Sequence, residues 1–396
     1  MGALTCFTLA AAHGADLTWH SVATRQDLAC VIREPAVSPA GACPVVFYLQ
    51  NLAAPRIGTE ADDTIVSDLQ AAGYLVVTVD YAHAARARVP FINRDLGTLR
   101  DEVRAGRLLG DRKIDAAHVF IVPAGSRLKR DVTFYRDGDR ALAMDIIFPS
   151  KPTRPVGVAL EFSCDNQDRM GNTSLSICSD TILDAEATEG LAVAMADHPV
   201  PAPYHGLDAM PDSAWKIKAA VRTLRATADE LGLNGRIVPV GFSRGSGMAL
   251  MLVTTAGLTE FDGRGEHPKQ NSEVQGAVVM SGRYTYLDLL PTDKMLPRYA
   301  KAWGDHDTHL ETWRRQGALD YLQKAPAMPL FLTVNCSEAP EALYQMKVLR
   351  QRLAALSADE IFLLDREPRG HKVTLDPVIL TAMNRYLHEQ LDPIAQ

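Results

Sequence analysis

The sequence lacks the residue patterns that mark common metal and nucleotide sites. It contains no C-x-x-C or H-E-x-x-H pattern and no acidic calcium loop, which argues against a zinc or calcium centre. No G-x-G-x-x-G stands between an expected strand and an expected helix, so a dinucleotide cofactor is not indicated. We therefore expect an activity that needs no cofactor.

Positive charge and long apolar runs are also scarce. Lys and Arg number 41 against 48 Asp and Glu, which gives a net charge of −7 and argues against nucleic acid as a partner. No apolar stretch reaches 18 residues, so no transmembrane helix is predicted. The 47% hydrophobic and 22% charged content over 396 residues is that of a globular enzyme somewhat larger than one typical domain.

The first 15 residues and the cysteines bear on the compartment. Residues 1–15 are apolar and end in small residues, like the tail of a secretory signal peptide without its basic start, so we expect a secreted or periplasmic protein. Two local disulfides are then possible, although buried free thiols are an equally ordinary alternative. The possible pairs are Cys30 with Cys43 and Cys164 with Cys178, leaving Cys6 and Cys336.

Strand-like and helix-like segments alternate along the chain, which predicts an α/β fold with a mostly parallel, doubly wound sheet. The expected strands cover 17–22, 28–33, 44–49, 73–80, 119–122, 132–135, 142–147, 155–160, 190–196, 237–240, 274–281, 329–334 and 360–364. The expected helices cover 62–72, 95–109, 212–231, 340–356 and 376–391. Residues 284–325 carry Leu, Met and Trp at helical spacings and are expected to form a small cap over the site or, alternatively, crossover packing.

The first part of the chain resembles the part that follows. Matching segments lie 111 residues apart at Pro44 and Pro155, and 117 apart at Ser126 and Ser243. We therefore predict that residues 16–126 are a degenerate half-copy of the catalytic domain at 127–396, the alternative being that any two βαβ series look alike. Gly125-Ser126-Arg127 even mimics the motif at Ser243, but no glycine follows it.

The clearest chemical motif is Gly241-Phe242-Ser243-Arg244-Gly245. It follows the apolar run 237–240 and precedes helix-forming residues, which predicts a strand, a sharp turn and a helix with a serine at the apex. The two glycines allow neighbouring backbones to approach, so that the serine hydroxyl projects as a nucleophile.

A serine needs a base, and the base needs a carboxylate to orient it. His371, in Arg369-Gly370-His371 just past the last expected strand, is the preferred base among the histidines that follow Ser243. The acid should lie just past the strand that ends at Val334, and Glu338 is the first choice. Glu341 and Asp365 are the alternatives for this role. The other histidines after Ser243 are His267, His306, His309 and His388.

From about residue 130 onward, these motifs resemble the α/β-hydrolase superfamily near its esterase, lipase and prolyl-oligopeptidase-like branches. The resemblance implies an oxyanion hole built from the N–H of Arg244 and a second N–H from the segment after 155–160. That segment has no His-Gly pair, so Phe162 and Ser163 are both candidates for the second donor. The Ser-Arg pair resembles the elbow of glucuronoyl esterases, which implies that Arg244 supports the oxyanion or binds an acidic substrate, unless it is an ordinary helix-surface arginine.

The sequence thus predicts a serine hydrolase that cleaves carboxylic esters through an acyl-enzyme, with a small-molecule or carbohydrate-linked ester as substrate. A plant-polymer ester is a plausible example. The alternatives are a prolyl-oligopeptidase-like serine peptidase and a catalytically inactive binding module with the same fold.

Overall fold

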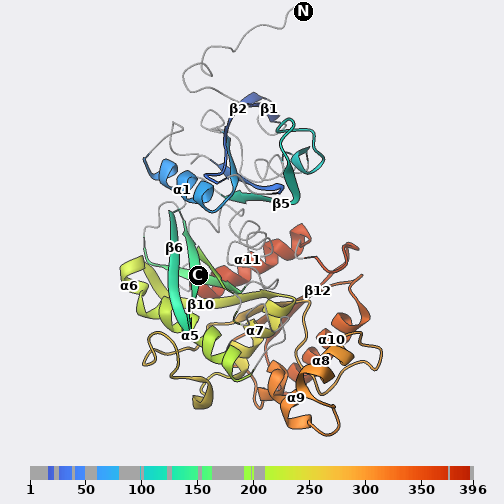
Figure 1. The fold of residues 1–396 in the computed structure, drawn as a ribbon. Helices are drawn as coiled ribbons and strands as arrows, with labels where there is room; N and C mark the ends of the chain where they lie inside the picture. The colour runs from blue at the N-terminus through green and yellow to red at the C-terminus, as the bar shows by residue number, and fades with distance from the viewer. Residues whose placement is uncertain are drawn as a thin grey trace, which may run out of the picture. The chain divides into compact units, whose positions relative to one another are not determined.

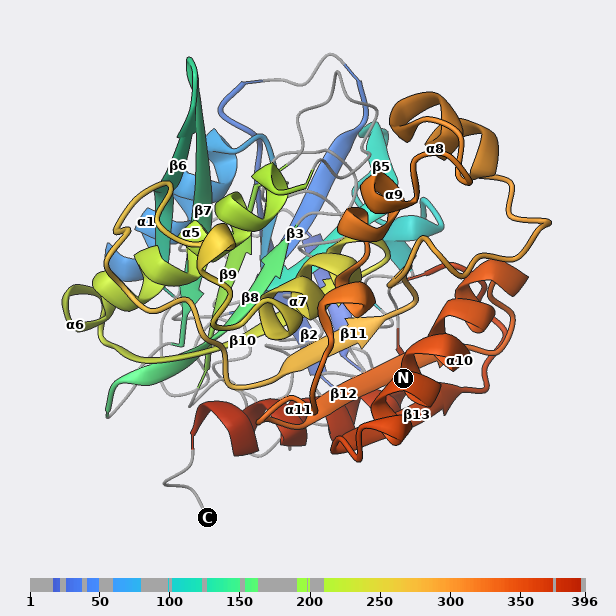
Figure 2. The same ribbon diagram turned by 90° about the horizontal axis from the view of Figure 1, so that it is seen from below.

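The computed structural model of the chain comprises two compact units (Figures 1 and 2). The first unit contains residues 1–128, 148–151 and 179–189, and the second contains 129–147, 152–178 and 190–396. The structure describes residues 17–21, 26–37, 41–49, 60–79, 99, 102–122, 127–149, 154–162, 191–197, 199, 210–372 and 375–392. No helix within these ranges is long and apolar enough to span a membrane.

The first unit contains a five-stranded sheet in the order β1-β2-β4-β3-β5. The interior strand β3 runs parallel to its neighbours β4 and β5, while β2 runs antiparallel to both β1 and β4. The alternate residues Val45, Phe47 and Val77 are buried in its core. The elements are β1 (Leu17–Ser21), β2 (Gln26–Arg33), β3 (Cys43–Leu49), α1 (Glu60–Ala71), β4 (Leu75–Val79) and β5 (Ile114–Val122).

Of the two alternatives for Cys30 and Cys43, a disulfide or buried free thiols, the structure has the free thiols. Cys30 lies on β2 and Cys43 on β3, and β4 lies between these strands. Two strand spacings amount to roughly 10 Å, whereas a disulfide joins Cα atoms at most about 7 Å apart. Cys336 is also free, and Cys6, Cys164 and Cys178 lie outside the described residues.

The second unit contains an eight-stranded sheet in the order β13-β12-β11-β10-β8-β9-β7-β6. The six strands β9-β8-β10-β11-β12-β13, in this spatial order, are each parallel to their neighbours, and β7 is antiparallel to β9. Every residue of β8 and β12 is buried, as expected of parallel strands with helices on both faces. The strands are β6 (Arg127–Asp137), β7 (Arg140–Phe148), β8 (Val156–Phe162), β9 (Leu191–Ala196), β10 (Leu233–Phe242), β11 (Ala277–Met280), β12 (Leu330–Asn335) and β13 (Glu360–Asp365).

Helices cover both faces of this sheet. Figure 1 shows α11 on one side of it and α5 and α7 on the other; α11 packs on β8 and β10, while α7 packs on β8, β10 and β11. The helices are α5 (Asp212–Ala226), α6 (Ala228–Leu231), α7 (Arg244–Thr254), α8 (Leu296–Trp303), α9 (Leu310–Gln316), α10 (Pro340–Ala355) and α11 (Pro377–Leu391), with 3₁₀ turns η3 (Thr259–Phe261) and η4 (Ala318–Tyr321).

Two expected helices differ from the structure. The helix expected over 212–231 is interrupted at Thr227, where α5 ends and α6 begins. The helix expected over 95–109 is helical at residues 102–104 but continues as turns, because Gly106, Leu109 and Gly110 adopt positive φ angles of 70°, 72° and 64° that end a right-handed helix.

The first five strands of each unit follow the same spatial order. β6-β7-β9-β8-β10 repeats β1-β2-β4-β3-β5, with β8 parallel to both of its neighbours as β3 is. The β3–β5 pairing and the corresponding β8–β10 pairing also both show a register shift near their start. The half-copy stays a prediction, and this shared order supports it.

The segment expected to form a cap contains α8, α9 and η4. Four aromatic side chains pack together there, and Tyr299 stacks on Trp303 with ring centroids 4.9 Å apart and an interplanar angle of 3°. Arg283 makes a bidentate ion pair with buried Asp293 at the start of the segment. The role of a cap over the site stays a prediction.

Cationic side chains of α5 bind the irregular segment 255–273 and hold it against the rest of the second unit. Lys218 donates to the carbonyl of Thr255 at 2.8 Å and to Asp262 at 3.2 Å. Arg222 also binds Asp262, and Arg225 donates to the carbonyls of Gly235 and Glu273. Lys218 and Arg222 are fully buried, so the segment is anchored from inside the protein.

Candidate active site

Ser243 stands at a sharp turn between β10 and α7. Its backbone has φ 56° and ψ −119°, a conformation that a non-glycine residue adopts only when its surroundings enforce it. The Ser243 N–H donates to the carbonyl of Met280 at 2.9 Å, which ties the turn to the adjacent strand β11. The strand–turn–helix expected from the motif is therefore present.

Glycine is required at both flanking positions because backbone atoms approach too closely for a side chain. A Cβ on Gly241 would lie 2.1 Å from the carbonyl oxygen of Gly245, and a Cβ on Gly245 would lie 2.8 Å from that of Phe162. Gly282 is equally constrained, since its Cβ would lie 2.7 Å from the carbonyl oxygen of Ser243. At all three glycines, main-chain atoms therefore occupy the space that a side chain would need.

A continuous chain of hydrogen bonds joins Ser243, His371 and Glu338. The Ser243 Oγ lies 2.9 Å from His371 Nε2. On the opposite side of the ring, His371 Nδ1 lies 2.9 and 3.0 Å from the two carboxylate oxygens of Glu338. Because β10, β12 and β13 are parallel, the loops after their carboxyl ends meet at one edge of the sheet.

Glu338 is placed as an ionised acceptor. Its side chain is fully buried, whereas that of His371 is 49% exposed. Burial raises the pKa of Glu338, but hydrogen bonds from His371 and Ser281 lower it by more, so the net pKa lies below its usual value. A buried carboxylate of this kind can stabilise a positive charge on the imidazole.

The alternative acids occupy other positions. Asp365 ends β13, and its carboxylate accepts from the N–H of Glu367 at 3.1 Å and from Arg369 Nη1 at 3.1 Å. Glu341 lies in the first turn of α10, where its charge complements the helix dipole. Of the three candidates, Glu338 contacts His371.

His371 also packs against the residue before the nucleophile. Its ring centroid lies 4.7 Å from that of Phe242, with an interplanar angle of 32°. The preceding Gly370 has φ 67°, a left-handed conformation that glycine adopts without a Cβ penalty. Of the other histidines that follow Ser243, His267 lies in the segment 255–273, His306 and His309 lie between α8 and α9, and His388 lies on α11.

The structure describes two of the three residues predicted as oxyanion donors, Arg244 and Phe162. Arg244 is the first residue of α7, so its N–H belongs to a helix N-terminus, where unpaired N–H groups favour negative charge. Phe162 is buried at the end of β8, next to the first turn of α7. Ser163 lies outside the described residues, and the identity of the second donor stays a prediction.

Three supporting residues were missed by sequence reasoning. Ser246 Oγ donates to the carbonyl of Ser243 at 2.5 Å, and the hydroxyl of buried Tyr284 accepts from the N–H of Gly282 at 3.0 Å. Ser281, at φ 48°, directs its hydroxyl to Glu338. The only sequence signal is proximity, since Ser246 follows the nucleophile by three residues and Ser281 ends an apolar run.

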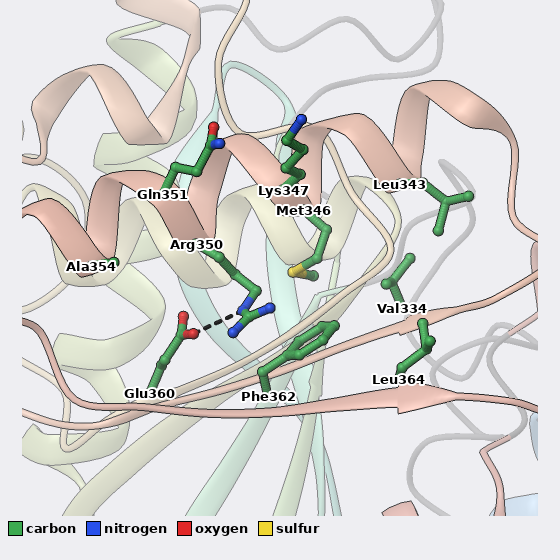
Figure 3. A pocket seen from close by; sticks show the side chains of 10 residues that line it. All are labelled: Val334, Leu343, Met346, Lys347, Arg350, Gln351, Ala354, Glu360, Phe362 and Leu364. Atoms are coloured by element: carbon green, nitrogen blue, oxygen red, sulfur yellow. Dashed lines mark hydrogen bonds and ion pairs between the residues drawn. The ribbon is translucent and has the colours of Figure 1, made fainter.

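A separate groove lies between α10 and the edge strand β13 (Figure 3). It has a volume of about 380 Å³, and the Arg350 guanidinium lies 3.9 Å above the Phe362 ring while pairing with Glu360 at 2.8 Å. Neither Ser243 nor His371 lines it. The groove is therefore distinct from the hydrogen-bonded site.

Comparison with known proteins adds evidence on the fold. No protein-family model and no curated protein matches the chain. A truncated carbohydrate esterase from gut microbiota aligns with a TM-score of 0.55 and 16% identity, over 67% of this chain and 96% of its own. A thermophilic esterase from Thermogutta terrifontis aligns with 0.51 and 17%, over 69% and 95%. A bifunctional GH43-CE protein of Bacteroides eggerthii aligns with 0.55 and 18%, over 66% and 38%. The chain shares their fold.

Proposed function

We propose that the protein is a serine esterase of the α/β-hydrolase superfamily. The observation that carries this proposal is the chain of hydrogen bonds from Ser243 through His371 to buried Glu338. Nucleophile, base and acid occur along the sequence in the order serine, acid, histidine, which is the order of that superfamily. The fold shared with several esterases supports the same reaction class.

In the acylation step, His371 Nε2 accepts the hydroxyl proton of Ser243 as Oγ bonds to the ester carbonyl carbon. The carbonyl oxygen becomes an oxyanion, which the N–H of Arg244 and a second donor at Phe162 or Ser163 stabilise. The tetrahedral intermediate then collapses, the bond to the alcohol oxygen breaks, and His371 returns the proton to the departing alcohol.

Deacylation repeats these steps with water. His371 takes a proton from the water as its oxygen attacks the acyl carbon, and the proton then passes to Ser243 Oγ as the carboxylic acid leaves. One ester and one water therefore give one acid and one alcohol. Glu338 holds the proton on His371 Nδ1 throughout, which keeps Nε2 available as the acceptor and stabilises the transient imidazolium.

The proposed substrate is an ester borne on a carbohydrate. Two proteins that share the fold are described as a carbohydrate esterase and as a GH43-CE protein. Arg244, beside the nucleophile, adds a positive charge that suits either the oxyanion or an acidic sugar.

Hydrolysis assays with ester and anilide substrates test the proposal. We expect the wild type to cleave p-nitrophenyl acetate, p-nitrophenyl butyrate and acetylated xylo-oligosaccharides. We expect it not to cleave peptide p-nitroanilides. A fluorophosphonate should add to one serine, which peptide mapping by mass spectrometry should identify as Ser243. Preferential cleavage of the anilides would favour a peptidase, and an absence of both hydrolysis and labelling would favour a binding module.

A further inference from the structure

Two loops carry the proposed acid and base, and hydrogen bonds that involve neither catalytic side chain join them. The acid loop, residues 336–339, follows β12, and the base loop, residues 366–371, follows β13. Both loops start at the same level of the sheet, because Asn335 and Asp365 are paired in register. The Cys336 N–H also donates to the carbonyl of Asp365 at 2.7 Å.

The Asn335 side chain connects the two loops. Its Oδ1 accepts from the N–H and the hydroxyl of Ser337 at 2.9 and 2.8 Å. The same oxygen accepts from the N–H of Arg369 at 3.3 Å, and Nδ2 donates to the carbonyl of Glu367 at 2.6 Å. Asn335 is buried, so these bonds are shielded from competition with water.

Ser337 extends this network to the base. Its hydroxyl donates to Asn335 and accepts from the N–H of Gly370 at 2.8 Å, which is the residue before His371. On its other side Ser337 precedes Glu338 directly. The hydroxyl therefore fixes the backbone on either side of the Glu338–His371 hydrogen bond.

We propose that Asn335 and Ser337 form a clasp that positions His371 against Glu338 and Ser243. They act through the backbone and touch no reacting atom, so they are positioning residues. Half of the His371 side chain is exposed, so side-chain packing alone holds it weakly and its placement depends on the loop. A misplacement of about 1 Å in such a site can cost about a hundredfold in rate. The inference rests on the proposed esterase function.

Substitutions at Ser337 test the clasp, with a neighbouring residue as the control. Ser337→Ala removes the acceptor for Gly370, and we expect kcat on p-nitrophenyl acetate to fall by about ten- to a hundredfold while KM stays within about twofold. Ser337→Thr keeps the hydroxyl on an exposed side chain and should restore kcat. Cys336→Ser changes the adjacent exposed side chain but keeps a donor for the Arg366 carbonyl, to which the thiol donates at 3.3 Å, and should match the wild type.

The rate of fluorophosphonate labelling should fall in parallel with kcat, because it needs the same base but no substrate pocket. Thermal unfolding of each variant separates loss of activity from loss of folding. A Ser337→Ala enzyme with wild-type kcat overturns the clasp, as does an equal loss in Ser337→Thr or a rise in KM alone. In each case an active wild type leaves the esterase proposal standing. A wild type with no hydrolysis and no labelling refutes that proposal instead.

Discussion

The two sheets share the spatial order of five strands, and within the described residues the second sheet continues past the fifth strand while the first does not. In the first unit β5 is an edge strand, and β6 begins at Arg127, directly after Ser126. In the second unit β10 leads into α7, and the sheet then adds β11, β12 and β13. The proposed acid and base lie on the loops after those added strands. Within the described residues, the first sheet has no strands that correspond to β11, β12 and β13.

The flanking residues sharpen this contrast. Gly241 and Gly245 permit main-chain contacts that leave no room for a Cβ, whereas Ala124 and Leu128 stand at the corresponding positions around Ser126. Ser126 lies outside the described residues, so this part of the contrast rests on the sequence alone. Side chains at both flanking positions would not permit the close main-chain approach that Gly241 and Gly245 make.

The largest expected effect comes from the two serines. Ser243→Ala removes the proposed nucleophile and should lower kcat on p-nitrophenyl acetate by about 10⁶-fold, to the level of the background reaction. Ser126→Ala should leave kcat unchanged, because the described sheet of the first unit has no strands that correspond to β12 and β13, which lead to the proposed acid and base. Steady-state kinetics of both variants check this, and comparable losses in the two would end the contrast between the units.

Substitution of the proposed acid, Glu338, on the loop after β12 should have the next largest effect. Glu338→Gln keeps the shape of the side chain but can no longer hold the proton on His371 Nδ1, so kcat should fall by up to about 10⁴-fold. Glu341→Gln, in the first turn of α10, should keep wild-type kcat within a factor of about two. If Glu341→Gln is instead the inactive variant, the assignment of the acid is wrong.

The turn glycines should affect stability as well as rate. Gly245→Ala places a Cβ 2.8 Å from the Phe162 carbonyl oxygen, and relieving this contact should lower the free energy of unfolding by about 1–3 kcal/mol. Gly247→Ala, two residues further along α7, meets its nearest atom at 3.2 Å and gains helix propensity of up to about 1 kcal/mol. Chemical denaturation should show a loss for the first variant and little change for the second.

The smallest expected effect is on the pH dependence of stability. It concerns Asp320 on η4, in the part of the second unit that the first unit does not repeat. Burial raises the pKa of Asp320 to about 6, against the lowering effect of a hydrogen bond from Thr285. Because the folded pKa lies above the unfolded value of about 3.9, Asp320 contributes stability at low pH that is lost as the pH rises through about 6. Asp320→Asn should therefore raise Tm by a few degrees at about pH 8 and by less at about pH 4.5. An equal change at both pH values would contradict this.

The sequence was most informative where chemistry dictates a local pattern. The motif at 241–245 predicts its strand, turn and helix, and the chain order of strands leads to Glu338 and His371 as the partners that lie within hydrogen-bond distance. Choosing among Glu338, Glu341 and Asp365 required the structure, since all three follow buried strands or open a helix. The sequence left open whether Cys30 and Cys43 form a disulfide, because a short loop in sequence says nothing of which strand inserts between its ends. Ser281 and Tyr284 depend on contacts between distant segments, which no local pattern encodes.

The cationic side chains of α5 have a consequence for how the second unit tolerates change. Surface loops ordinarily accept insertions because few contacts hold them. The segment 255–273 has the composition of such a loop, but fully buried Lys218 and Arg222 bind it from within. Salt screens buried pairs of this kind weakly, so high ionic strength should not release it. Insertions there would leave the buried Lys218 and Arg222 without their partners, so this irregular stretch should tolerate changes in length poorly.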